Sequence, residues 1–206
     1  MVAGLVTAVL LTGCQPSDDA TTPPPSVTPS ATVGTSGSPN ASPTASATPT
    51  PSPSLVVTAR PTTPEETAVL AAEAEFVYRE YQRLMDEYES KGGVNGPLPD
   101  ELRQFVGGNF VSGVQSSLQY TYDRGSKFEG ATEVGVKEVF FNALRPESLI
   151  GVAFCNDLTR RTATTRDGKV VRVNARVINR AEFSRGTDGR LRITDNSAAE
   201  VPTCDA

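Results

Sequence analysis

VRVNARVINRAEF, residues 171–183, alternates small or apolar side chains with charged and polar ones over most of its length. Successive side chains of a strand point to opposite faces of a sheet, so this pattern predicts one long strand with a buried and a wet face. Asp167-Gly168 before the stretch and Gly186-Thr187-Asp188-Gly189 after it are typical of hairpin turns. The stretch therefore predicts antiparallel pairing in the second half of the chain.

The segments around this strand show the same period of two. Residues 149–155 and 191–193 alternate, and residues 134–141 alternate with a change of phase near Lys137-Glu138. One extra residue in a strand shifts the phase in this way, so we expect a β-bulge there. Together these segments predict an antiparallel sheet of several strands.

Helical patterns precede the strands. Thr63-Pro64-Glu65-Glu66 combines an N-cap, a proline at the first helical position and the acidic residue of a capping box. Two further helices are predicted, a short one from Pro99 and a longer one over Asn109–Asp123. The predicted first helix buries one face, which is made by Leu70, Ala74, Val77, Tyr81, Leu84 and Tyr88. Helices followed by antiparallel strands define an α+β fold, with N-terminal helices packed on a curved sheet.

The N-terminus carries an export pattern. Residues 2–11 are apolar, but a helix needs roughly 20 such residues to span a bilayer, so they fit a signal peptide better. Leu11-Thr12-Gly13-Cys14 resembles the lipobox of bacterial lipoproteins, which implies cleavage before Cys14 and lipidation of that cysteine. A plain secretory signal is the alternative. The leader has no Lys or Arg before its apolar run, so we expect the translated chain to start further upstream.

A tether follows the leader. Residues 15–54 are almost wholly Pro, Ser, Thr, Ala and Gly, a composition that cannot bury enough apolar surface to fold. We expect a signal peptide over residues 1–13, a disordered tether over 14–61 and a domain over 62–206. The tether is either a bare spacer or O-glycosylated. The predicted location is the extracytoplasmic face of the cell membrane, held by lipid at Cys14.

Two cysteines remain once Cys14 is assigned. Exported proteins favour disulfides, so Cys155 and Cys204 are expected to pair, which ties a middle strand to the C-terminal tail. Two unpaired buried thiols are the alternative.

The domain resembles the nuclear-transport-factor-2-like cone, also called the SnoaL-like fold, as found in small tethered lipoproteins of actinobacteria. The resemblance covers residues 64–206 and rests on LPDELRQFVGGNF, AFCNDLTRR, RDGKVV and DGRLRITDNSAAEVPTC. Leu191 departs from it, since many such domains have a tryptophan there. The fold hosts isomerases, cyclases, hydratases and non-catalytic modules, so it does not define the activity.

Composition excludes several classes of function. The chain has no histidine, which excludes a Ser-His-Asp triad, a Cys-His dyad and an imidazole metal site. Its net charge of -5 argues against nucleic-acid binding. No residue pattern predicts a metal site or a cofactor.

Three functions fit what is left. The favoured one is a non-catalytic module that binds a partner protein, a wall polymer or a small apolar ligand. The second is a cone-pocket isomerase or cyclase, for which Asp157, Tyr120, Tyr122 and Asp123 are the candidate acid–base residues.

The third is an envelope assembly subunit, and its clue is a cluster of basic residues. Six basic residues are expected to form a patch for anionic lipid or wall polymer: Lys169, Arg172, Arg176, Arg180, Arg190 and Arg192. Of these, Arg172, Arg176 and Arg180 are expected on one face of a strand. A merely solvated face, or one paired with the acidic first helix, is the alternative. The oligomeric state is left open.

Overall fold

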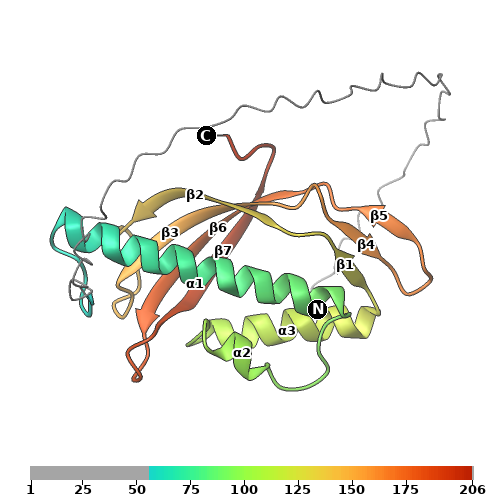
Figure 1. Cartoon of the computed structure of the whole chain (residues 1–206), viewed down its shortest axis with the longest axis horizontal. Coiled ribbons are helices and arrows are strands. Elements are labelled where there is room, and N and C mark those ends of the chain that lie inside the picture. The colour runs from blue at the N-terminus through green and yellow to red at the C-terminus, as the bar shows by residue number, and fades with distance from the viewer. Residues whose placement is uncertain (1–55, 206) are drawn as a thin grey trace, which may run out of the picture. The chain divides into compact units, whose positions relative to one another are not determined.

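The structure, a computed structural model, describes residues 56–205. The expected leader, Cys14 and most of the expected tether lie outside this range. Three helices pack on one face of an antiparallel sheet (Figure 1), namely α1 (Pro64–Ser90), α2 (Asp100–Arg103) and α3 (Phe110–Arg124). The α+β class predicted from the sequence is confirmed.

Seven strands of the described residues form two antiparallel sheets. The larger has the order β2-β3-β6-β7, with β2 (Glu133–Phe140), β3 (Ile150–Asp157), β6 (Arg176–Arg185) and β7 (Leu191–Val201). The smaller has the order β1-β4-β5, with β1 (Lys127–Glu129), β4 (Thr162–Thr164) and β5 (Val170–Arg172). The expected bulge is confirmed, because the β2–β3 register shifts between Val136 and Glu138.

The first helix begins as predicted. The Thr63 side chain accepts a hydrogen bond from the backbone N–H of Glu66, and the Glu66 carboxylate accepts one from the backbone N–H of Thr63. These bonds satisfy two backbone donors that a helix start leaves free. The cap sets the phase of a 27-residue helix whose buried face lies on the sheet.

The single long strand predicted over residues 171–183 is wrong. The chain leaves strand geometry at residues 173–175, and its two halves, β5 and β6, belong to different sheets. The segment between β3 and β4 bends opposite residues 173–175. There the backbone N–H of Val173 donates to the carbonyl of Arg161, and the backbone N–H of Leu158 donates to the carbonyl of Ala175. One long hairpin is therefore bent, and its tip, the β4–β5 hairpin, pairs with β1 instead of extending the main sheet.

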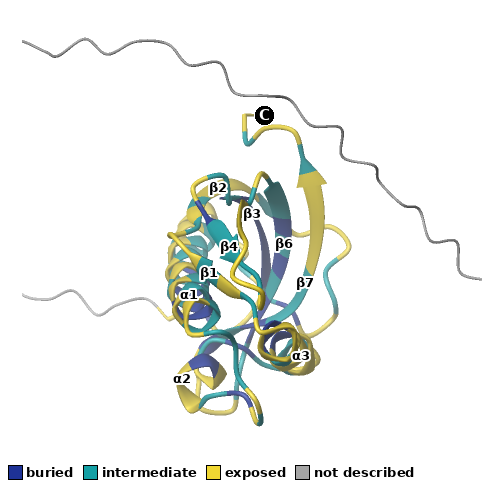
Figure 2. Ribbon diagram, turned by 90° about the vertical axis from the view of Figure 1, so that its right-hand side faces the viewer, coloured by how far each residue is buried: buried dark blue, intermediate teal, exposed yellow. Residues whose placement is uncertain are grey.

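Aromatic rings join the helices to the sheet. The rings of Tyr78 on α1 and Phe154 on β3 stack with centroids 3.9 Å apart, and Phe183 on β6 meets Phe154 edge-on. These strands form the buried centre of the domain, whereas the last half of β7 is exposed (Figure 2). The rings fix α1 across the middle strands and leave its C-terminal half to line the site described below.

Residues 56–61, which the sequence assigns to the tether, pack against the domain. Val57 is buried in the core, and its carbonyl accepts a hydrogen bond from Arg185. Arg60 donates to the carbonyls of Ser148 and Arg145. Residues 50–206 form a compact unit of their own, and the buried core cluster lies between Val57 and Ile193. We therefore expect a fragment of residues 50–206 to fold by itself.

Candidate functional site

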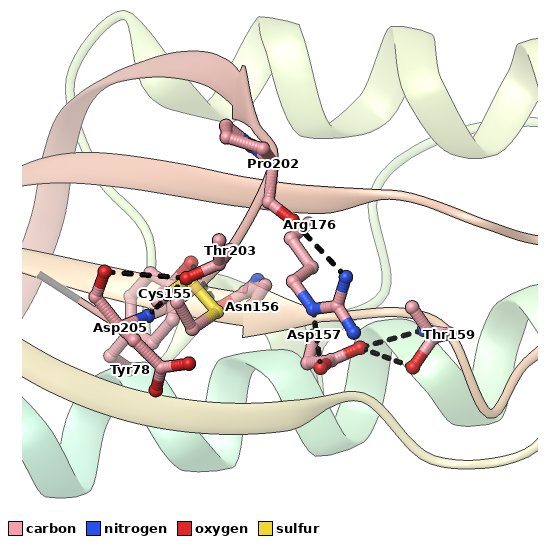
Figure 3. The surroundings of a disulfide bond; sticks show 10 residues. Tyr78, Cys155, Asn156, Asp157, Thr159, Arg176, Pro202, Thr203 and Asp205 are labelled. Carbon is pink, nitrogen blue, oxygen red and sulfur yellow. Dashed lines mark hydrogen bonds and ion pairs between the residues drawn. A yellow bond between two sulfur atoms is a disulfide. The ribbon is translucent and has the colours of Figure 1, made fainter.

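The predicted disulfide is confirmed. Cys155 on β3 is bonded to Cys204, with their Cα atoms 5.8 Å apart. The bond holds the C-terminal tail against the face of the sheet that points away from the helices (Figure 3). Arg176 strengthens this attachment, because it donates to the carbonyl of Pro202 and pairs with Asp157 at 2.9 Å. The cysteines and Arg176 thus have a structural role here.

The six basic residues come from two different sheets and the turns beside them. Lys169 and Arg172 lie on the β4–β5 hairpin, Arg176 and Arg180 lie on β6, and Arg190 and Arg192 lie at the start of β7. Arg172 is in a different sheet from Arg176 and Arg180, so the expected row of three arginines on one strand is not present. The last four of the six pair with acids, as Arg176–Asp157, Arg180–Glu138, Arg190–Asp188 and Arg192–Asp188. These acids come from strands and a turn, not from α1.

The acid–base candidates named from the sequence do not form one site, because Tyr120 and Asp123 line an open hollow on α3 while Asp157 lies at the end of β3. Tyr120, Tyr122 and Asp123 are exposed on α3. Asp157 accepts hydrogen bonds from the hydroxyl and backbone N–H of Thr159. These bonds and Arg176 lower the pKa of Asp157 to about 2, so its carboxylate is a weak base. An acid–base site built on these four residues has no support in this geometry.

A cavity of about 220 Å³ lies between the C-terminal half of α1 and the helix-facing side of β3 and β6. Six of the nine lining residues carry a polar group, and polar and apolar atoms share the lining surface about equally. The lining residues are Tyr81, Gln82, Met85, Glu89, Asn156, Leu158, Arg161, Val177 and Asn179. Ligand pockets for drug-sized molecules are larger, roughly 300–1,000 Å³, so this cavity suits a smaller and more polar group.

A chain of hydrogen bonds runs through the wall of this cavity. The buried hydroxyl of Tyr78 donates to Asn156, and the Asn156 amide donates to Gln82. Gln82 in turn donates to Asp86, which also accepts two bonds from Thr132. Since buried polar groups are costly unless they are bonded, this chain holds the polar wall in one arrangement.

The side chain of Arg161 lies at the end of this series of hydrogen bonds, between the carboxylates of Asp86 and Glu89. Its Nη2 lies 2.8 Å from Glu89 and its Nη1 lies 3.3 Å from Asp86, while its side chain is 6 % exposed. The Phe128 ring lies over the guanidinium, 5.2 Å from ring centroid to Cζ. Within the described part of the chain, Arg161 Nε is buried and has no hydrogen-bond partner.

Burial changes the proton affinities of the groups around the cavity. It raises the pKa of the Glu89 carboxyl, and the nearby Arg161 charge opposes this effect. Burial also raises the pKa of the Tyr78 and Tyr81 hydroxyls, so both remain protonated donors. Two acids facing one guanidinium leave the site with an excess of negative charge when both are ionised. Such a wall favours neutral or cationic polar groups over anions.

Only weak signals in the sequence point to this site. Asn156 and Asn179 continue the inward-facing positions of two apolar strands, and Gln82 and Glu89 continue the helix stripe at spacings of three and four. Nothing in the sequence singles out Arg161, because its position depends on the bend between β3 and β4. Within the described residues, no three acidic, cysteine or histidine side chains gather as a metal site would require.

No protein-family model matches the sequence, and no curated protein matches it. One similar solved structure is the intermembrane space region of chloroplast protein ARC6, with a TM-score of 0.43 and 15% identity, covering 64% of this chain and 97% of that one. Another, from Catenulispora acidiphila, has a TM-score of 0.39 and 15% identity, covering 66% and 94%. Both likenesses are too distant to assign a fold family or a function. Among the described helices, none combines the length and apolarity of a membrane span.

Proposed function

We propose that this protein is a membrane-anchored, extracytoplasmic lipoprotein whose nuclear-transport-factor-2-like domain binds a small polar group of the cell envelope without transforming it. The polar cavity between α1 and the sheet carries the proposal. Its wall presents amide, hydroxyl and carboxylate groups, and Arg161 Nε offers a buried donor that lacks a partner. A ligand that accepts a hydrogen bond there recovers the cost of leaving that donor unpaired.

The chemistry of the wall selects among the ligands that the sequence allows. A small apolar ligand would leave the polar wall unpaired, whereas a fragment of a wall polymer carries amides and hydroxyls that match it. The nuclear-transport-factor-2-like assignment draws support from the helices on one face of a twisted antiparallel sheet. The lipobox-like Leu11–Cys14 and the Pro/Ser/Thr-rich segment after it support anchoring at Cys14.

The ligand site is tested by NMR on the fragment of residues 50–206. N-acetylglucosamine, which is small and neutral, serves as the probe, and amide shifts are followed as it is added. We expect saturable shifts around Asn156, Arg161 and Asn179. Val177→Phe, which fills the cavity, should abolish them, while the matched Val170→Phe on the exposed hairpin should keep them. Shifts in the wild type that are absent or scattered over the surface would contradict the proposal. Shifts that persist unchanged in a folded Val177→Phe variant would contradict it as well.

Anchoring is tested in a bacterial host that expresses the full chain. We expect the intact protein to remain with the membrane after a high-salt wash and to gain the mass of a diacylglyceryl cysteine. Cys14→Ser should release the protein or leave an uncleaved precursor. A mature protein that carries no lipid would contradict this part of the proposal.

A catalytic alternative has one observation in its favour. Glu89 is a buried carboxyl with a raised pKa in the cavity, next to Tyr81, as a general base in an apolar site would be. However, its bond to Arg161 holds the carboxylate in place and weakens it as a base. Exchange of the α-hydrogens of acetone and cyclohexanone in D₂O, measured for the wild type and Glu89→Gln, separates the two functions. Exchange that the variant loses would favour the enzyme, and no exchange above buffer would favour the binding module.

A further inference from the structure

Five of the seven basic side chains that form no ion pair within the described residues gather at one end of this domain. Most arginines elsewhere pair with an acid, but five exposed bases around the small sheet and the end of α3 form no ion pair within the described residues. They are Arg124, Lys127, Arg166, Lys169 and Arg172. Three acids lie among them. Asp123 and Asp167 accept hydrogen bonds from nearby side chains, and Glu129 lies beside Lys127 on β1.

Apolar side chains are exposed at the same end. Val170 is 62% exposed and Val171 is 39% exposed, although both lie in a strand. Tyr120 and Tyr122 on α3 are also exposed. These four are half of the eight large apolar side chains that are exposed in the described part of the chain. A soluble surface seldom groups such residues unless they meet a partner.

The strand register places the two kinds of side chain together. Lys127 pairs with Thr164, which pairs with Val170, so Lys127 and Val170 point to the same face of the small sheet. Arg172, two residues along β5, shares that face. Val170 thus lies on one face of the small sheet together with Lys127 and Arg172. The strand that carries it, β5, is an edge strand of that sheet (Figure 1).

We propose that this β4–β5 hairpin docks on an anionic phospholipid bilayer. Basic residues near such a surface each raise the affinity about fivefold, and exposed apolar side chains enter the interface. The valines favour a bilayer over a soluble polyanion, because a polymer offers no apolar phase to receive them. This inference uses a different surface from the cavity and does not depend on what the cavity binds.

The anchor proposed at Cys14 makes such docking efficient. The hairpin lies at the end of α1 opposite to the point where the preceding segment joins the domain (Figure 1), and α1 is about 40 Å long. The proposed tether therefore has to let the domain turn so that the hairpin faces the membrane. Because the tether keeps the domain close, even weak docking becomes intramolecular.

The test uses the fragment of residues 50–206, which carries no lipid, and vesicles sedimented at low and high salt. We expect binding to vesicles with about a third phosphatidylglycerol, and little binding to pure phosphatidylcholine or at high salt. Lys169→Glu with Arg172→Glu should lower the partition coefficient at least tenfold, and Val170→Ser with Val171→Ser about threefold. The control, Lys137→Glu with Arg79→Glu, makes the same charge change elsewhere and should have a much smaller effect.

Three results would overturn the proposal. One is no binding to the anionic vesicles. Another is an equal loss in the hairpin and control variants, which would mean that only net charge matters. The third is binding to soluble polyphosphate that matches vesicle binding and ignores the valine changes, because the partner would then be a polyanion. Thermal melts of all variants show whether each is folded, and Val170→Ser with Val171→Ser keeps every charge if the charge reversal prevents folding.

Discussion

The ring of Phe140 on β2 covers Gly151 on β3. A Cβ atom added to Gly151 would lie 2.3 Å from Cε2 of that ring, far inside van der Waals contact. On its other side the ring meets the guanidinium of Arg180, whose Cζ is 4.0 Å from the ring centroid. Gly151 is thus required for space, since it lets an aromatic ring close the face of the sheet that no helix covers.

Gly151→Ala should therefore destabilise the domain. The ring has to move off β3 and lose its contact with Arg180, and overpacking of this kind costs about 1–3 kcal/mol in the free energy of unfolding. Urea denaturation of the fragment of residues 50–206 measures this change. Phe140→Ala in the same chain should reduce the effect of Gly151→Ala, because it removes the clashing ring.

Gly113→Ala is the matched control for this substitution. Gly113 lies within α3, and a Cβ there would meet no atom within 4 Å. Alanine is the better helix former, so this variant should be about 0.5–1 kcal/mol more stable than the wild type. If both glycine substitutions changed stability alike, the tight packing of Phe140 on Gly151 would be refuted.

The Cys155–Cys204 bond should contribute a large part of the stability. It closes a loop with a sequence separation of 49 residues, for which the chain-entropy model gives about 4 kcal/mol, with measured values often lower. Cys204→Ser leaves Cys155 packed in the sheet and should lower the free energy of unfolding by about 2–4 kcal/mol. Reductant should destabilise the wild type by a similar amount and leave the variant unchanged. A variant as stable as the oxidised wild type would show that the bond does not form.

The parts of the fold that the sequence predicted correctly depend on neighbouring residues. The capping box at Thr63 and Glu66 and the change of phase at Lys137 each act over a few positions, so they can be read without the tertiary structure. The split between β5 and β6 cannot be predicted in this way, because the alternation of apolar residues continues through residues 173–175. The bend is fixed by two backbone hydrogen bonds across the hairpin, from Val173 to Arg161 and from Leu158 to Ala175.

The site was harder to predict for the same reason. Arg161 meets Glu89 across 72 residues of chain, and only the bend after β3 brings them together. The three arginines expected on one strand face were divided by that same bend. Arg176 and Arg180 lie on β6, where they pair with Asp157 and Glu138, while Arg172 lies on the hairpin.

Asp157 should titrate far below an ordinary aspartate. Its pKa is lowered to about 2, first by the Thr159 hydroxyl, then by the Thr159 backbone N–H, and to a smaller extent by Arg176. Thr159→Val and Arg176→Met should therefore each raise this pKa, as followed by carboxyl ¹³C NMR. Since the folded-state pKa is lowered, the stabilisation is present above pH 3.8 and is lost as the pH falls through about 2. A pKa that neither variant raises would contradict this account.

Glu89 should have the opposite effect on stability. Its pKa is raised by burial, so the folded protein binds this proton more tightly than the unfolded chain does. The contribution of Glu89 is present at low pH and is lost as the pH rises through the folded-state pKa, above the ordinary value of 4.5. The free energy of unfolding of the wild type minus that of Glu89→Gln should thus fall as the pH rises from 4 to 7.

Glu87→Gln, on the same turn of α1, gives the matched control with the opposite sign. The hydrogen bond and charge of Lys91 lower the pKa of Glu87, which is exposed. The stabilisation by Glu87 is present above 4.5 and is lost on acidification, so the corresponding difference should rise with pH over the same range, by a small amount because solvent screens the pair. If the two differences followed pH in the same direction, Glu89 would not be the buried acid beside Arg161, and the general-base alternative for the cavity would lose its support.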